Sequence, residues 1–180
     1  MGRRDDLVDA ALQVLAQGGL KGLTHRAVDV EAGLPSGSTA NIFRTRDSLV
    51  RALLEEMELR DWRQLQAGLG NAAMRTPLSV DEAALALADA TIRMVAPEQA
   101  PVTRARLTLS LVYADDVRRI HVRLVGALTR LLDSAGTRSP ASRAVQVAAL
   151  IDGTLLHALT VSEEPLDRTA LASAIRALLG

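Results

Sequence analysis

Residues 36–46 read SGSTANIFRTR, a run of small and polar side chains that ends in two arginines. The hydroxyl and backbone N–H groups of residues 36–38 are suited to phosphate oxygens, particularly at the start of a helix. Asn41 carries an amide that can form two hydrogen bonds with the edge of an adenine base. Arg44 and Arg46 follow and would neutralise nearby phosphates. This chemistry suits a nucleic acid, but small polar residues between helices more often form a simple loop. The elements on either side of the run indicate which of the two interpretations holds.

Two helices are predicted before this run. Apolar residues recur at helical spacing over residues 7–15, and the glycine pair 18–19 would end that first helix. Thr24 is a suitable N-cap for a second helix. The second helix is short, because Gly33 favours a sharp end and Pro35 prevents continuation.

Two short helices joined by a turn that contains glycine are typical of a helix-turn-helix. Here the turn would be residues 33–35, and the second helix would be residues 36–43. In this motif the second helix lies in the major groove, with its N-terminal residues on base edges. Small side chains let the backbone come close to DNA. We interpret Ile42 and Phe43, the apolar pair at the end of this helix, as core residues that anchor it.

The rest of the chain also has helical periodicity. An apolar stripe over residues 49–57, preceded by a cap at Thr45 or Asp47, predicts a long helix that reaches about residue 69. We expect a break over residues 68–79 and four or five further helices after it. No useful length alternates with period two, so no strands are predicted.

The predicted fold is therefore all-α, with two domains. A three-helix domain with the helix-turn-helix would occupy residues 1–48, and a helical ligand-binding and dimerisation domain would occupy residues 49–180. The composition agrees, because 48% of the residues are apolar and only 2% are aromatic. A core of Leu, Val and Ala favours helices over strands.

Charge and cysteine content exclude several classes of protein. The formal net charge is zero, so any nucleic-acid site must be local. The chain contains no cysteine, which excludes disulfides and thiolate metal sites and suits the cytoplasm. We expect no metal and no cofactor. The longest uncharged apolar run, residues 144–151, is far shorter than the roughly 20 residues of a membrane span, and acidic residues near the N-terminus argue against a signal peptide.

Residues 4–57 resemble the N-terminal domain of the TetR family of transcriptional regulators. The spacing matches without a gap, and the rest of the chain is similar to the family's second domain in layout. The matching positions are Leu7, Val8, Asp9, Ala10, Ala11, Leu12, Gly19, Thr24, Ala32, Gly33, Leu34, Gly37, Ser38, Phe43, Arg46 and Leu49.

The chain departs from the family pattern in the predicted recognition helix, residues 36–43. Ala40 stands where the family usually has an aromatic residue, and Asn41 replaces a common His or Trp. Arg46 replaces a frequent Lys and keeps its charge. Pro35 stands where a capping Ser is common, so we expect Ser36 to take the cap. The usual sequence preference is therefore in doubt, while DNA binding is not.

The resemblance implies a set of DNA contacts. A flexible basic arm would be formed by Arg3 and Arg4. For His25 and Arg26 a solvated first helical turn remains an equal alternative. The residues expected to face the groove are Ser36, Gly37, Ser38, Ala40 and Asn41, and those expected to face phosphates are Thr24, His25, Arg26 and Arg46.

The resemblance also implies a pocket for a small molecule and a dimer interface in the C-terminal domain. Each pocket candidate also suits a plain core or surface role. The pocket candidates are Trp62, Arg93, Arg104, Tyr113 and His121, and the interface candidates are Val147, Ile151, Leu155, Leu159, Leu171 and Ile175.

The expected function is that of a ligand-responsive regulator of transcription. It would act as a repressor that binds a palindrome-like operator in double-stranded DNA as a homodimer, and a small-molecule effector would release it. An enzyme is not expected, because there are only three histidines, no cysteine and none of the common catalytic motifs. The alternative is a helical adaptor or small-ligand-binding protein that does not bind DNA.

Overall fold

The computed structural model describes residues 2–69 and 78–180, with the backbone alone over residues 64–69. Within these ranges the regular structure is entirely helical, which confirms the all-α prediction. Most of the predicted break, residues 70–77, lies outside the described residues. The helices are α1 (Arg3–Gly22), α2 (His25–Glu31), α3 (Ser38–Ile42), α4 (Arg46–Leu69), α5 (Val80–Val95), α6 (Ala100–Val112), α7 (Ala114–Ser134), α8 (Pro140–Thr160) and α9 (Arg168–Leu179).

The chain forms two compact units. Unit 1 contains Met1–Arg60 and Pro101–Val117, so it includes most of α6 as well as the predicted helix-turn-helix. Unit 2 contains Asp61–Ala100 and Arg118–Gly180. The predicted functional division at residues 48 and 49 stays a prediction.

In unit 1, α1 buries the apolar stripe that the sequence predicts, including the fully buried Leu7 and Leu15. Regular helix is interrupted at Gly19, whose φ of 59° is readily adopted only by glycine. The predicted end at this glycine pair is therefore only partly correct, because helical turns resume and continue to Gly22.

The starts of α2 and α4 are capped by threonines. The Thr24 hydroxyl accepts a hydrogen bond from the Ala27 N–H at 3.2 Å, which confirms the predicted cap. At α4, the Ser48 N–H donates to Thr45 Oγ1 at 3.1 Å, and the Thr45 N–H donates to Ser48 Oγ at 3.2 Å. Thr45 rather than Asp47 therefore caps α4. The stripe on α4 is buried as predicted.

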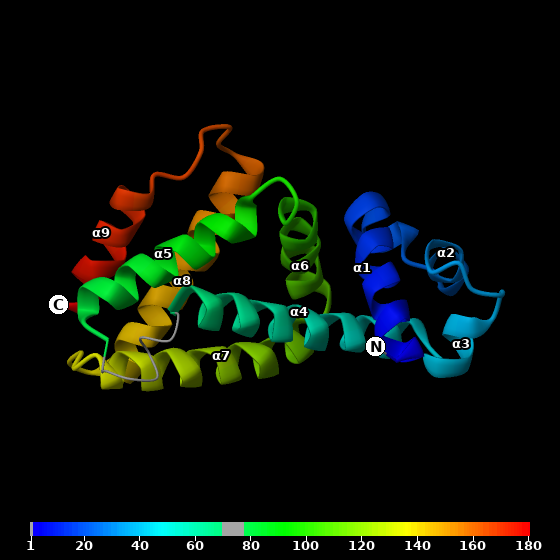
Figure 1. The fold of residues 1–180 in the computed structure, drawn as a ribbon, viewed down its shortest axis with the longest axis horizontal. Coiled ribbons are helices and arrows are strands. Elements are labelled where there is room, and N and C mark those ends of the chain that lie inside the picture. Colours follow the sequence, from blue (N-terminus) through cyan, green and yellow to red (C-terminus); the bar gives the residue numbers. More distant parts are fainter. Residues whose placement is uncertain (1, 70–77) are drawn as a thin grey trace. The chain divides into compact units, whose positions relative to one another are not determined.

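Unit 2 is built around an apolar cluster contributed by four helices. Helix α9 packs along α5 and against α8 (Figure 1). The start of α9 is held by Arg168, whose guanidinium donates to both carboxylate oxygens of Asp89 on α5, at 2.5 and 2.8 Å. The cluster consists of Ala84, Leu87, Ala88, Leu128, Leu132, Ala144, Val147, Ala148, Leu171, Ala172, Ile175 and Leu179. Across the described residues, none of the helices is long and apolar enough to cross a membrane.

This cluster includes several residues predicted to form a dimer interface. Val147, Leu171 and Ile175 belong to it, and Leu155 is only 3% exposed. Side chains that are already buried within one chain have almost no surface to bury against another. The helical stripe correctly indicated burial, but Val147, Leu171 and Ile175 are buried inside unit 2, and Leu155 is buried within the chain itself. Of the predicted set, Ile151 and Leu159 keep partly exposed side chains.

Candidate nucleic-acid interface

Helix α3 has no capping side chain at its N-cap, because that residue is Gly37, with φ 91°. Asp29 on α2 supplies the cap instead. Its Oδ2 accepts a hydrogen bond from the Gly37 N–H at 2.7 Å. Its Oδ1 accepts from the Thr39 N–H at 2.7 Å and from the Thr39 hydroxyl at 2.5 Å. Asp29 and Thr39 are both buried, so charge-assisted hydrogen bonds join the two short helices.

Asp29 carries its charge at neutral pH. Burial by itself would raise the pKa of Asp29. The hydrogen bonds from the Thr39 hydroxyl and from the N–H groups of Thr39 and Gly37 outweigh that effect, and the charge of His25 acts in the same direction. The pKa of Asp29 is therefore lowered, and the carboxylate remains an acceptor for all three donors.

The donors at the start of α3 are used inside the protein, so the predicted phosphate site there is not formed. The Gly37 N–H is taken by Asp29, and the Ser38 N–H donates to the Pro35 carbonyl at 3.1 Å. The Ser38 hydroxyl donates to the same carbonyl at 2.7 Å. Ser38 is only 6% exposed, contrary to its predicted place on the groove-facing side. Helix α3 begins at Ser38 rather than Ser36, which is exposed.

The surface of α3 is formed by three consecutive exposed residues, Ala40, Asn41 and Ile42. Phe43, which follows them, is 4% exposed, so its predicted core position is confirmed. Ile42 was predicted to be a second anchor, and this is wrong because its side chain is 38% exposed. Asp29 and Thr39 provide the second attachment instead. The exposed surface of α3 therefore carries one hydrogen-bonding side chain between two apolar ones.

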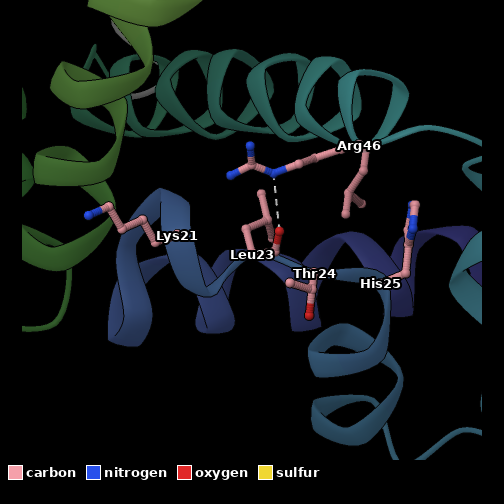
Figure 2. A pocket seen from close by; sticks show the side chains of 6 residues that line it. Lys21, Leu23, Thr24, His25 and Arg46 are labelled. Atoms are coloured by element: carbon pink, nitrogen blue, oxygen red, sulfur yellow. Dashed lines mark hydrogen bonds between the residues drawn. The ribbon is translucent and has the colours of Figure 1, made fainter.

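An open notch of about 430 Å³ lies beside the start of α2 in unit 1. Figure 2 shows Arg46 extending from α4 toward the backbone at Leu23, with Thr24 and His25 at the start of α2. The Arg46 guanidinium donates to the Leu23 carbonyl at 3.3 Å and also to the Leu20 carbonyl. The residues that line the notch are Lys21, Leu23, Thr24, His25, Arg46 and Leu49.

This notch gathers three of the four residues predicted to face phosphates. Thr24 and Arg46 are exposed, and His25 is half-buried. The fourth, Arg26, is exposed on α2 and lines a second, adjacent hollow that also contains Thr24. Arg46 is held by backbone carbonyls, which fixes the position of its charge at the rim. The arrangement places cationic and hydroxyl groups together on one part of unit 1.

Arg3 and Arg4 do not form the predicted flexible arm. Both lie in the first turn of α1. Arg3 donates to the Ser38 hydroxyl at 3.2 Å. The Arg4 guanidinium lies 5.6 Å from the centre of the Phe43 ring and 3.6 Å from the Glu55 carboxylate. The two arginines therefore hold α1 against α3 and α4.

The five candidates for a ligand pocket do not lie together in one unit. Trp62 packs against the core of unit 2, and Arg93 and His121 are half-buried in the same unit. Arg104 is exposed on α6 in unit 1. Tyr113 also belongs to unit 1, where its hydroxyl donates to Asp47 Oδ1 at 3.0 Å.

Asp29 is the site residue that the sequence reasoning missed. Asp29 is one of two acids on the short helix α2, and an acid in such a position resembles an ordinary solvated residue. The signal that could have identified it is the absence of a capping side chain at Gly37, eight residues later. A helix start without its own cap needs an acceptor from another element.

The comparison with known sequences places the chain among bacterial regulators. No model of a protein family matches it. The HTH-type transcriptional regulator BetI of Paraburkholderia xenovorans (strain LB400) is 32% identical, over 93% of this chain and 87% of its own length. The BetI protein of Burkholderia mallei (strain NCTC 10229) is 29% identical over the same shares.

Solved structures share the whole fold. A TetR family member from Streptomyces coelicolor A3 matches with a TM-score of 0.79 and 25% identity, over 100% of this chain and 99% of that one. The multidrug binding protein EbrR, solved with imidazole, matches with a TM-score of 0.76 and 26% identity, over 100% and 96%. The BetI relatives are transcriptional regulators and not enzymes, as the sequence predicts for this chain. The chain belongs to the TetR family of transcriptional regulators.

Proposed function

We propose that this protein is a ligand-responsive repressor that reads a palindrome-like DNA operator with α3. The observation that carries the proposal is the construction of α3, which exposes Ala40, Asn41 and Ile42 while Asp29 and Phe43 hold it in place. A short helix that is attached to the domain through its buried residues and exposed on its other side fits a major groove. Asn41 supplies the hydrogen-bonding group for a base edge.

The charges around α3 support the same function. Between residues 21 and 46 there are four Lys or Arg residues and two acids, and one of those acids is the buried Asp29. The cations are Lys21, Arg26, Arg44 and Arg46. We assign four residues to contacts with DNA phosphates: Thr24, His25, Arg26 and Arg46. The small residues Ser36, Gly37 and Ala40 are assigned to the groove-facing surface, where they let the protein backbone come close to the DNA. The near-neutral chain then binds DNA through this local cluster.

A homodimer would place two copies of α3 on successive half-sites about one helical turn apart. We propose that α8 and α9 form the interface, since this is the layout that the family resemblance implies. The buried residues of the predicted interface set would hold α8 and α9 in place beneath the contact surface. The exposed apolar side chains Val145, Leu156 and Val161, together with Ile151 and Leu159, would make the contact.

A small-molecule effector is proposed for the C-terminal domain, residues 49–180. EbrR, a structural relative, has been solved with imidazole and with malachite green. For this chain we propose a site in unit 2, the unit to which Trp62, Arg93 and His121 belong. Effector binding would release DNA, and by linkage DNA would weaken effector binding by the same factor. Because its target is DNA, we propose that the protein works in the cytoplasm.

A gel-shift experiment tests the central part of this proposal. DNA fragments from around the protein's own gene are mixed at low salt with protein whose dimeric state has been verified. One fragment should be retained in preference to unrelated DNA of equal length. If the verified dimer retains no fragment, the repressor assignment fails and the alternative of a helical adaptor without DNA binding gains support.

A further inference from the structure

Ile42 is a β-branched residue at the end of α3 whose side chain is partly exposed beside Asn41. Its side chain is 38% exposed, whereas Phe43 beside it is 4% exposed and Leu49 is fully buried. Helix α3 is held by Phe43 and by the hydrogen bonds between Thr39 and Asp29. Ile42 is therefore not needed to attach α3 to unit 1.

The position of Ile42 suggests what its side chain contacts. It adjoins Asn41, the only residue of the exposed run 40–42 with a hydrogen-bonding side chain. The cations Arg44 and Arg46 follow within four residues. An apolar side chain beside an amide and among cations complements the major groove, which combines base edges, thymine methyl groups and bordering phosphates.

The C5 methyl of thymine is the apolar group that base edges present in the major groove. If Asn41 bonds an adenine, an A·T pair is already present where α3 lies. Several side chains of one recognition helix contact base edges along the same stretch of the major groove. Alanine and larger apolar side chains can both contact this methyl group. Ile42 presents more apolar surface than Ala40, so it can cover more of a methyl group on the same or an adjacent pair.

We propose that Ile42 is a specificity-determining residue that contacts the C5 methyl of a thymine in each half-site. This inference rests on the proposed function, since it requires that α3 enters a major groove. It assigns to Ile42 a preference for thymine that the hydrogen-bonding group of Asn41 cannot supply.

The test replaces thymine by deoxyuridine, which removes only the methyl group. A binding duplex is first selected from randomised DNA, and each thymine in a half-site is then exchanged singly. At one position the wild-type protein should bind about fourfold more weakly, the effect of one buried methyl group. Exchange at the other positions should change the dissociation constant little.

The variant Ile42→Ala, measured on the same duplexes, shows whether Ile42 causes the difference between thymine and deoxyuridine. It should bind thymine and deoxyuridine at that position equally, while Asn41→Ala, the matched control, should keep the difference. The circular dichroism of Ile42→Ala should match that of the wild type, and its melting temperature should fall only slightly, because the side chain is partly exposed and α3 is also held by Phe43 and Asp29. The wild-type measurement needs no variant and therefore stands even if Ile42→Ala folds poorly.

Three results would overturn the inference. The wild type could bind every singly substituted duplex equally well, or Ile42→Ala could keep the discrimination against deoxyuridine. Ile42→Ala could also weaken binding to all duplexes alike, which would place Ile42 against the sugar-phosphate backbone. In each case DNA binding itself survives. Failure of the proposed function is distinct, because no duplex would then be enriched in the selection.

Discussion

Asp29 and Thr39 are joined by two hydrogen bonds that span the turn between α2 and α3. One Asp29 oxygen accepts the Thr39 N–H at 2.7 Å and the Thr39 hydroxyl at 2.5 Å. The other oxygen holds Gly37. The orientation of α3, and with it the direction of Asn41, therefore depends on a carboxylate that belongs to the preceding helix.

Replacing Asp29 by Asn should destabilise unit 1. The amide keeps the size of the side chain but loses the charge. Its NH₂ group replaces one of the two carboxylate oxygens, so a hydrogen-bond donor then faces a backbone N–H group that had an acceptor. Hydrogen bonds to a charged group contribute about 1.5–3 kcal/mol, so the free energy of unfolding should fall by about that amount. Denaturant unfolding measures it. Glu31→Gln, an exposed acid on the same helix, is the control and should change little.

The same carboxylate gives unit 1 an acid dependence. The pKa of Asp29 is lower in the folded protein than in the unfolded chain, so the stabilisation is fully present above the ordinary value near 3.8. It is lost as pH falls below that value and through the lowered folded pKa. Stability measured over this window should fall less steeply in Asp29→Asn than in the wild type. Equal slopes would mean that another group controls the loss.

Asn41→Ala should relax sequence preference at one base pair in each half-site. A bidentate contact with adenine discriminates by about 1–3 kcal/mol. Selection from randomised DNA, with wild type and variant in parallel, measures the change position by position. The melting temperature should not change, because Asn41 is exposed. An unaltered preference would remove Asn41 from the base-reading residues.

Arg46→Ala should weaken binding to all DNA sequences alike. The side chain is assigned to a phosphate, so its loss should reduce the slope of log K against log salt by about one. Titrations at several salt concentrations, with specific and unrelated duplexes, provide the slopes. Arg143→Ala, in unit 2, is the control for a general change in charge. A loss confined to the specific duplex would contradict the assignment.

Tyr113 offers a direct optical test of its contact with Asp47. Burial raises the pKa of Tyr113, and the hydrogen bond and negative charge of Asp47 raise it further. Tyr113 is the only tyrosine in the chain, so the phenolate absorbance reports this residue alone. Its midpoint should lie above the ordinary value near 10. The variant Asp47→Asn should lower that midpoint, and an unchanged midpoint would show that the contact is absent in solution.

The sequence predicted the features that depend on long periodic patterns or on local chemistry. The all-α fold followed from apolar stripes such as that of α4, and the cap at Thr24 followed from its type and place. Ile42 was wrongly predicted to be a core residue because α3 has only five residues, too few for a periodic pattern to distinguish its buried and exposed faces.

Contacts between distant elements were not predictable in this way. The acceptor role of Asp29 depends on the turn that brings α3 back to α2, which a pattern of residue types does not describe. Val147 and Ile175 were correctly predicted to be buried, but the stripe does not say which surface covers them. Their partners became clear only from the packing of α5, α8 and α9.

The most direct test of sequence-specific DNA reading through α3 is a competition measurement. A duplex selected from randomised DNA competes, at physiological salt, with a duplex of the same composition in scrambled order. The protein should prefer the selected duplex by at least about a thousandfold, the usual margin of specific over non-specific binding. Asn41→Ala should reduce that ratio while leaving the affinity for scrambled DNA unchanged. Equal affinity of the wild type for both duplexes would contradict the account.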